Sequence, residues 1–213
     1  MKESTSIRQF VVGDIQTNCF ALVSKGECIV IDPGAAGARI AQELQDVRVT
    51  RVIATHRHHD HVCGVAALLR ACEPRPLFCI GHADAEGAQR AVELSSHVFD
   101  VAGQDLENAP KPDVLLREGD VINVGEESLR VIEAPGHTEG GIVLLGDGVA
   151  FVGDTLFAGS CGRTDLQGGD YISLMQTLQR LKEEIPPQTL LLCGHGPHTT
   201  MEQELTTNPW LMQ

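Results

Sequence analysis

Short apolar runs that stop at a histidine or an aspartate constrain the fold of this chain more than any other feature. Four runs share the pattern, and the residues at their ends are Thr55-His56, Gly136-His137, Gly153-Asp154 and Gly194-His195. In three of them glycine precedes the polar residue, and glycine lets the backbone turn sharply where a side chain must enter a crowded cavity. We interpret the runs as strands that each end at a residue of one shared site.

The segment from Thr55 to His61 concentrates the same residue types. It reads Thr-His-Arg-His-His-Asp-His and directly follows the apolar residues 52–54. Histidine is the commonest metal ligand, and a carboxylate suits a hard or borderline divalent ion. Side chains at 56, 58, 60 and 61, on a loop that leaves a strand, can diverge towards two neighbouring ions. A polar surface loop is the alternative, and four histidines with one aspartate straight after an apolar strand argue against it.

The order of the expected elements predicts the architecture. In the first part of the chain, short apolar runs separated by turn residues favour strands, and segments with helical periodicity follow. The strands are expected at 10–12, 20–23, 28–31, 51–55 and 77–80, and the helices at 38–44, 62–71 and 83–94. Residues 102–113 are polar and contain prolines, which is typical of a long connection.

The second part of the chain again places strands before a helix. Strands are expected at 114–116, 121–124, 129–132, 142–145, 149–152 and 189–193, and an amphipathic helix at 171–182. The turns between the first three strands predict a meander, and the next two pair across Gly146-Asp147-Gly148. We therefore predict an α/β (α+β) chain built as a four-layer αββα sandwich, with two sheets face to face and helices outside. A single domain, 1–213, would contain two packed halves at roughly 1–105 and 106–213.

Composition and charge exclude several classes of function. Acidic residues outnumber basic ones 29 to 16, which gives a formal net charge of −13. A surface that follows phosphates needs Lys and Arg, so nucleic acid is not an expected partner. The chain has no run of 18 apolar residues and no apolar stretch near Met1, so we expect neither a membrane span nor a signal peptide. Seven cysteines without a CxxC spacing fit reduced thiols and a cytoplasmic protein.

The combined pattern resembles the metallo-β-lactamase superfamily. The HxHxDH motif of that superfamily matches His56, His58, Asp60 and His61. Its later ligands match His137, Asp154 and His195 in order and context. The resemblance extends from Thr17-Asn18-Cys19 to Asn208-Pro209-Trp210 and therefore covers nearly the whole chain.

The resemblance implies a site for two divalent metal ions. The residues assigned to the first ion are His56, His58 and His137. The residues assigned to the second are Asp60, His61 and His195. Asp154 would bridge the two ions, and Asp32, in an Asp-Pro-Gly element, would orient the ligands from outside the coordination shell. Zinc is the expected metal, with iron or manganese as alternatives, because the same nitrogen and oxygen donors accept all three.

Within the superfamily the chain resembles the short, single-domain relatives of glyoxalase II. The supporting segments are 157–165, 168–170 and Gly194-His195-Gly196-Pro197. Asp154, where the best-known zinc β-lactamases have a cysteine, argues against that subfamily. Glu139 is a departure, because proline is common there in the His-Thr-Pro-Gly version of the motif.

The activity implied by this resemblance is hydrolysis of a thioester, typically S-lactoylglutathione, a small-molecule S-2-hydroxyacylglutathione. Two adjacent divalent ions lower the pKa of a bridging water, and the resulting hydroxide would attack the thioester carbonyl. Asp60 is the candidate catalytic residue that orients the nucleophile or handles its proton. The thiolate leaving group has a free pKa of roughly 8.5, so a strong general acid is scarcely needed.

Three other functions compete with thioester hydrolysis. Residues 161–165 also resemble the persulfide dioxygenases of the superfamily, which hold one iron with a triad matching His56, His137 and Asp154. Gly194-His195-Gly196-Pro197 is more similar to the hydrolases, which favours hydrolysis. A lactonase of the same fold would differ only in substrate. A metal-holding scaffold without enzyme activity is the remaining alternative, and the complete ligand set disfavours it.

A few further residues have two interpretations each. Arg163 would either bind a substrate carboxylate with its planar guanidinium or pair with Asp165 or Asp170. Cys161 would either line the pocket or be a buried, inert thiol, and we favour the inert thiol. His59 occupies the variable position of the motif, where a residue behind the ligands or on the surface is expected. The histidines without ligand spacing, expected to be structural or solvated, are His82, His97 and His198.

Overall fold

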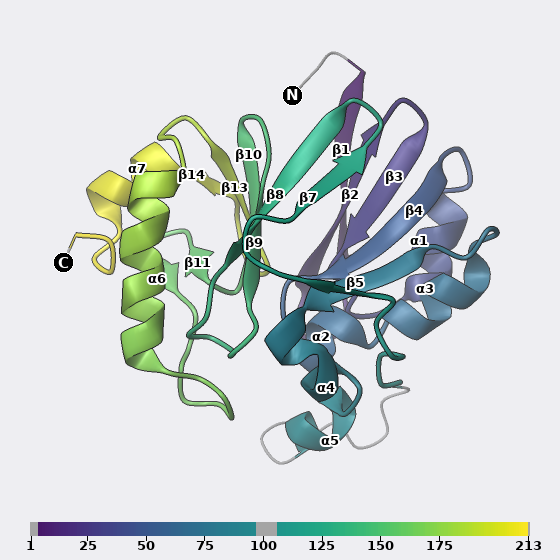
Figure 1. Ribbon diagram of the computed structural model, residues 1–213, viewed down its shortest axis with the longest axis horizontal. Coiled ribbons are helices and arrows are strands. Elements are labelled where there is room, and N and C mark those ends of the chain that lie inside the picture. Colours follow the sequence, from purple (N-terminus) through teal and green to yellow (C-terminus); the bar gives the residue numbers. More distant parts are fainter. Residues whose placement is uncertain (1–3, 97–105, 213) are drawn as a thin grey trace.

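Two six-stranded sheets face each other at the centre of the molecule, and helices cover their outer faces (Figure 1). The computed structural model describes residues 4–96 and 106–212. In Figure 1, α1 and α3 lie outside the first sheet, and α6 and α7 lie outside the second. The chain is therefore the expected four-layer αββα sandwich, and the predicted fold class is confirmed.

The first sheet has the strand order β1-β2-β3-β4-β5-β6. Its strands are β1 (Thr5–Val12), β2 (Thr17–Ser24), β3 (Glu27–Ile31), β4 (Arg48–Ala54), β5 (Leu77–Gly81) and β6 (Val114–Leu116). The first three strands pair antiparallel, and β3 to β6 pair parallel. Parallel strands need crossover connections, usually helical. Two helices in these connections are α1 (Gly37–Glu43) and α3 (Val65–Ala71), with the single turn α2 (His59–Val62) after β4.

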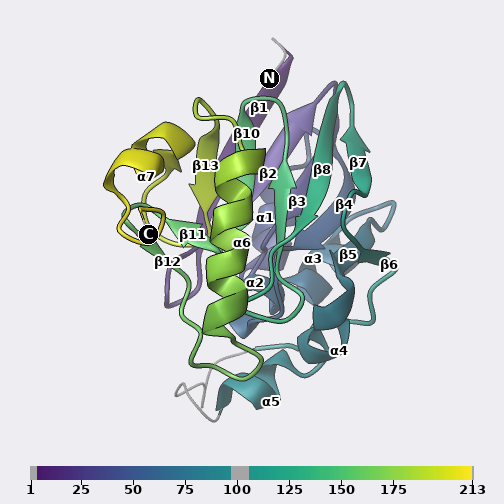
Figure 2. The same cartoon turned by 60° about the vertical axis from the view of Figure 1, so that its left-hand side comes forward.

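The second sheet has the strand order β14-β13-β10-β9-β8-β7. Its strands are β7 (Val121–Val124), β8 (Glu127–Glu133), β9 (Ile142–Leu145), β10 (Val149–Gly153), β13 (Leu190–Cys193) and β14 (Thr199–Thr200). A small hairpin of β11 (Leu156–Phe157) and β12 (Ser160–Cys161) follows β10. The helices of this half are α6 (Tyr171–Glu184), which runs along the outside of the sheet in Figure 2, and α7 (Met201–Thr207).

Three apolar clusters hold the four layers together. The central cluster joins the inner faces of both sheets, and Phe20 of β2 meets Phe151 of β10 there with ring centroids 5.7 Å apart. A second cluster packs Ile40 and Leu68 of the first pair of helices against the first sheet. The third packs Leu178 and other residues of α6 against the second sheet. Each sheet is thus apolar on both faces, which explains why its strands are read as nearly continuous hydrophobic runs.

The predicted meander is wrong for its first strand. β6 pairs in parallel with β5, with Val114 opposite Cys79, and so belongs to the first sheet. The turn of residues 117–120 therefore connects the two sheets, and only β7 and β8 form the expected antiparallel pair. Leu116 joins the central apolar cluster from the first sheet, which explains the pairing. The first sheet thus continues beyond residue 105, into the second of the two expected halves.

Two expected helices are shorter or more divided than predicted. The helix predicted at 62–71 begins only at Val65, because the chain passes so close to Pro33 that a Cβ on Gly64 would lie 2.4 Å from its carbonyl oxygen. The helix predicted at 83–94 is split into η1 (His82–Asp84), α4 (Ala85–Ala88) and α5 (Ala91–Ser96). Of the predicted connection at 102–113, residues 106–113 contain neither helix nor strand, and 102–105 lie outside the described residues. None of the described helices combines the length and apolar character needed to cross a bilayer.

Candidate metal centre

The histidines and aspartates singled out by the sequence meet where strands of both sheets end. His56 follows β4, and Asp60 and His61 lie on the short α2 directly after it. His137 follows β8. Asp154 comes directly after β10, and His195 two residues after β13. β4 is in the first sheet and the other three strands are in the second, so the site lies across the junction of the two sheets.

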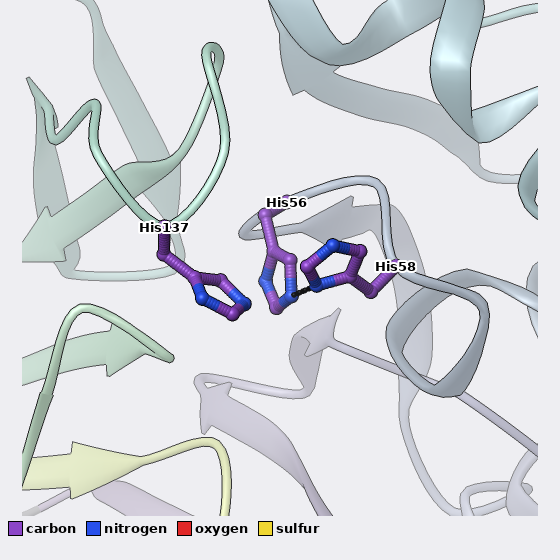
Figure 3. A group of neighbouring side chains, drawn as sticks. All are labelled: His56, His58 and His137. Atoms are coloured by element: carbon purple, nitrogen blue, oxygen red, sulfur yellow. Dashed lines mark hydrogen bonds between the residues drawn. The ribbon is translucent and has the colours of Figure 1, made fainter. Parts of the chain in front are cut away.

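The first group consists of His56, His58 and His137. One ring nitrogen of each lies within 4.8 Å of the others. Figure 3 shows the three rings turned towards one another, with His56 Nε2 only 3.0 Å from His58 Nδ1. The ring of His137 is 4.8 Å from that of His56 and 4.6 Å from that of His58, centroid to centroid. Three nitrogen donors therefore face one small volume.

The second group consists of Asp60, His61 and His195. Asp60 Oδ2 lies 3.0 Å from His195 Nε2 and 3.2 Å from His61 Nε2. Asp154 lies between the two groups, with Oδ1 3.4 Å from His61 Nε2 and Oδ2 3.6 Å from His137 Nε2. This is the position expected of a carboxylate that bridges two ions.

Unpaired polar atoms in this cluster fit a cation. Among the described residues, His137 Nε2 and Asp154 Oδ1 are buried and have no hydrogen-bond partner. A buried polar atom without a partner is costly unless a ligand or ion satisfies it. Imidazole nitrogens and carboxylate oxygens are the donors that zinc, iron and manganese accept. The arrangement is therefore that of a site for divalent metal ions.

The protonation of His56 and His58 supports the same conclusion. Burial holds the pKa of His56 well below its usual value, and burial lowers the pKa of His58 to about 3. Both rings are therefore neutral at pH 7 and keep a lone pair for a metal. His61 behaves differently. Burial lowers its pKa, but the carboxylates of Asp60, Asp154 and Asp32 outweigh burial and hold the pKa well above the usual value.

Asp32 lies behind the cluster, where the sequence places an orienting residue. Its Oδ1 accepts a hydrogen bond from the Thr55 backbone N–H at 2.6 Å, and its Oδ2 accepts one from Thr55 Oγ1 at 2.7 Å. Asp32 Oδ2 also lies 3.0 Å from His61 Nδ1, on the side of the ring away from Asp60. Asp32 has a positive φ of 54°, a backbone conformation that an aspartate tolerates better than most residues. Its orienting role stays a prediction that this geometry favours.

Backbone carbonyls lie behind two other histidines. His137 Nδ1 is 2.7 Å from the carbonyl oxygen of Arg163, and His195 Nδ1 is 3.2 Å from that of Ile15. Such contacts select the tautomer that leaves Nε2 free to bind a metal. Thr17 Oγ1 donates to Asp60 Oδ2 at 2.9 Å, a contact that sequence reasoning missed.

Asp84 is the principal residue that sequence reasoning missed. It is fully buried, and it contacts Arg57, between two predicted ligands, and Thr138, directly after a third. No ligand spacing surrounds Asp84 in the sequence. The only available signal was an aspartate soon after the apolar residues 77–80.

The residues with two interpretations now have defined surroundings. Arg163 makes a bidentate ion pair with Asp165 at 2.7 and 2.8 Å, and both side chains are exposed. Burial raises the pKa of the half-buried Cys161 to about 11, which favours the inert thiol. Glu139 accepts a hydrogen bond from Arg57 Nη1 at 3.0 Å. His59 is buried, so of its two expected locations the surface is wrong.

The three remaining histidines lie apart from the cluster or outside the described residues. His82 is 3.4 Å from Glu133 on the surface. The ring of His198 packs 6.5 Å from that of Phe20. His97 lies outside the described residues.

Comparison with solved structures identifies the same fold. The chain superposes on the BLEG-1 B3 metallo-beta-lactamase with a TM-score of 0.88 and 29% identity, over 98% of this chain and 100% of the other. For TTHA1623 in a di-iron-bound form the TM-score is 0.83 and the identity 30%, over 96% and 100%. For ETHE1 from Myxococcus xanthus the values are 0.73 and 26%, over 96% and 83%.

Comparison with protein sequences defines the family. The probable metallo-hydrolase YqgX of Bacillus subtilis is 32% identical over 96% of both chains. The hydroxyacylglutathione hydrolase GloC of Haemophilus influenzae is 30% identical over 92% of this chain and 93% of its own. A hydroxyacylglutathione hydrolase of Aeromonas salmonicida is 37% identical over 80% of this chain, which spans 58% of that protein. Residues 12–195 match the model of the metallo-beta-lactamase superfamily, and the chain therefore belongs to that superfamily.

Proposed function

We propose that this chain is a metal-dependent hydrolase that cleaves a small-molecule thioester of the S-2-hydroxyacylglutathione class. One observation carries the hydrolase proposal. Beside the His56, His58 and His137 group, the structure assembles a second donor group of Asp60, His61 and His195. The two groups, with Asp154 between them, fit a pair of divalent ions, and we propose zinc first, with iron or manganese as alternatives. The similarity to GloC supports the choice of substrate.

The metal ions would supply Lewis acidity, which lowers the pKa of a coordinated water and polarises the thioester carbonyl. His56, His58 and His137 would hold one ion, and Asp60, His61 and His195 the other. Asp154 would contact both. The neutral rings of His56 and His58 provide lone pairs without first losing protons at pH 7.

Asp60 is the proposed catalytic residue. Although burial raises its pKa, the charge of His61 and the hydrogen bonds from His195 and His61 hold it well below its usual range. The carboxylate is therefore ionised at neutral pH, and Thr17 and His195 fix the position of Oδ2. An ionised, fixed carboxylate can orient an attacking water and accept its hydrogen bond. No residue is assigned to protonate the leaving group, because a thiolate leaves without strong acid assistance.

The principal alternative is the persulfide dioxygenase. It would use His56, His137 and Asp154 for a single iron and would leave the second donor group without a role. Because the chain is similar to ETHE1, oxygen uptake on glutathione persulfide has to be assayed as well. The similarity to BLEG-1 makes a β-lactam the next substrate to test. A lactone completes the set, since a lactonase of the same fold would share every residue named above.

The test combines metal content with four assays on one preparation. We expect two metal ions per chain and hydrolysis of S-lactoylglutathione, with no oxygen uptake on glutathione persulfide and little turnover of nitrocefin or a lactone. One iron with persulfide-dependent oxygen uptake would overturn the proposal in favour of the dioxygenase. Two metals with faster cleavage of nitrocefin or the lactone than of S-lactoylglutathione would support the proposed metal centre and refute the proposed substrate.

Variants of the proposed ligands test the metal centre itself. His137→Ala and Asp154→Ala should lose both metal and thioesterase activity while the far-ultraviolet circular dichroism stays that of the wild type. His82→Ala is the matched control, because this histidine is half exposed on the surface beside Glu133. It should keep both properties. Full activity in either ligand variant would refute the assignment.

A further inference from the structure

Asp84 is a fully buried carboxylate that accepts four hydrogen bonds, two on each oxygen. Oδ2 accepts from the Arg57 backbone N–H at 2.9 Å and from Thr138 Oγ1 at 2.7 Å. Oδ1 accepts from Arg57 Nη1 at 3.2 Å and from the Gly140 backbone N–H at 2.9 Å. Each oxygen thus joins the segment that contains Arg57 to the segment that contains Thr138 and Gly140.

The donors to Asp84 are neighbours of the proposed ligands of the first ion. Arg57 lies between His56 and His58, and Thr138 directly follows His137. The two segments come from different sheets, since residues 55–58 follow β4 and residues 134–141 connect β8 to β9. Asp84 therefore links the parts of the chain whose separation sets the distance from His137 to the other two rings.

Close backbone packing reinforces this link. A Cβ on Gly140 would lie 2.3 Å from the Asp84 backbone nitrogen, and one on Gly81 would lie 2.1 Å from the Gly140 carbonyl oxygen. The turn of η1 therefore rests directly on the 134–141 loop. Arg57 extends the link, because its Nη2 donates to the Gln167 carbonyl at 2.8 Å and its Nη1 to Glu139. The guanidinium balances the charge of Asp84 inside the protein.

Asp32 offers a contrast on the other side of the site. Its contacts at Thr55 and His61 all lie within the first half of the chain. Thr55 Oγ1 also lies 3.2 Å from His56 Nδ1, so Asp32 stands behind one residue of each ligand group. Asp84 instead spans the two halves beside the first group. Of these two buried aspartates, Asp84 is therefore the one that joins segments of both halves.

We propose that Asp84 is a positioning residue that sets the geometry of the His56, His58 and His137 group and thereby its affinity for metal. The inference rests on the metal-centre part of the proposed function and is independent of the substrate. In Asp84→Asn, one oxygen becomes an amide that faces existing donors, so one of the two links between the segments is lost. Changes behind metal ligands commonly reduce affinity about 10–100-fold. We expect a fall of this size for one of the two ions, with the other nearly unchanged.

The experiment titrates the metal-free, full-length protein with Zn²⁺ in competition with a chromophoric chelator, which resolves two dissociation constants. The Co²⁺ absorption spectrum of each variant identifies the affected group. His58→Ala marks loss of the first group, and His195→Ala marks loss of the second. Asp84→Asn should weaken the same constant and alter the same Co²⁺ bands as His58→Ala.

Glu204→Gln is the matched control for burial of a carboxylate. Glu204 is also fully buried, and it accepts from Thr199 Oγ1 at 2.6 Å and from the Gly159 backbone N–H at 2.7 Å, away from the first group. It should lower the melting temperature and leave both metal constants at wild-type values. If Asp84→Asn does not fold without metal, Thr138→Val carries the test, because it removes a single bond to Oδ2 and should weaken the same constant to a smaller extent.

The outcomes separate the two proposals. If the wild-type protein takes up no Zn²⁺, the metal centre is wrong and the inference falls with it. If the wild type binds two ions and both Asp84→Asn and Thr138→Val bind them as Glu204→Gln does, the metal centre stands and the positioning role is refuted. Equal weakening of both constants would also refute it, because the inference assigns Asp84 to one group.

Discussion

Gly194 lies so close to the proposed metal ligands that one added methyl group should disrupt them. A Cβ at this position would be 2.1 Å from Asp154 Oδ1 and 2.8 Å from His61 Cε1. The backbone here is held on both sides, because the Gly194 N–H donates to the Gly153 carbonyl at 2.8 Å and the Gly194 carbonyl accepts from the Asn18 N–H at 2.7 Å. Gly194 is not among the glycines with positive φ, so alanine adds volume without backbone strain.

The size of the effect on activity follows from how far Asp154 Oδ1 must move away from the added Cβ. Ordinary van der Waals contact begins at 3.4 Å, so Asp154 Oδ1 must retreat by roughly 1.3 Å in Gly194→Ala. A misplacement of about 1 Å at a reacting centre can reduce the rate about 100-fold. We expect kcat/KM for the cleaved thioester to fall by about that factor, with weaker binding of metal. The added methyl should also destabilise the fold by about 1–3 kcal/mol, as overpacking does.

The assay compares Gly194→Ala with Gly146→Ala. At Gly146, which also has no positive φ, the nearest atom to an added Cβ is Leu129 Cδ2, 2.7 Å away at the end of a flexible side chain. Gly146→Ala should therefore lose some stability and keep metal content and kcat/KM. Thermal unfolding, metal analysis and steady-state kinetics are measured for both variants. Wild-type kinetics and two metals in Gly194→Ala would refute the assignment of Asp154 to a position between the ions.

Three further predictions concern protons, a thiol and the core. Zn²⁺ binding at pH 7 should release a proton from His61, because its raised pKa keeps the ring charged in the metal-free protein. Metal affinity should therefore fall as the pH is lowered. Calorimetry in buffers of different ionisation enthalpy measures the number of protons released, and a value of zero would contradict the raised pKa. Cys161→Ser should keep wild-type kcat. Ellman's reagent should modify Cys161 only slowly at pH 8, since its pKa of about 11 leaves little thiolate. Rapid modification would show that the Cys161 thiol is not inert. Leu178→Ala, in the fully buried face of α6, should lower the free energy of unfolding in urea by about 2–5 kcal/mol and leave metal stoichiometry unchanged. A decrease below about 1 kcal/mol would show that the cluster outside the second sheet repacks around the smaller side chain.

The predicted ligand residues were recognisable in the sequence because their signal is local. Four of them lie within residues 56–61, and three others follow apolar strands beside a glycine. Strand ends at one edge of a sheet are close in space, so a pattern of strand ends predicts a cluster. The structure brings these side chains together, with Asp154 between the two groups.

Features that depend on distant contacts were not recognisable. Asp84 is 27 residues from Arg57 and 54 from Thr138, and no periodic pattern connects them. β6 looked like the start of a meander because its turn is typical of a hairpin, but its partner is β5, from which a long connection separates it. The helix expected at 83–94 has good local propensity, yet distant segments hold Asp84 by hydrogen bonds, and the stretch is divided into η1, α4 and α5. In each case tertiary packing overrode the local preference.

The placement of the proposed ligands on both sides of the sandwich has a consequence for the lifetime of the protein. His56 and His58 extend from the first half and His137 from the second, so an ion bound by all three acts as a crosslink. A ligand that binds only the folded state, present at 100 times its dissociation constant, stabilises that state by about 2.7 kcal/mol. In a cell short of metal, the chain would lose this contribution and open more often at the seam between its sheets. Proteases degrade the open form, so metal supply would set the abundance of the protein as well as its activity.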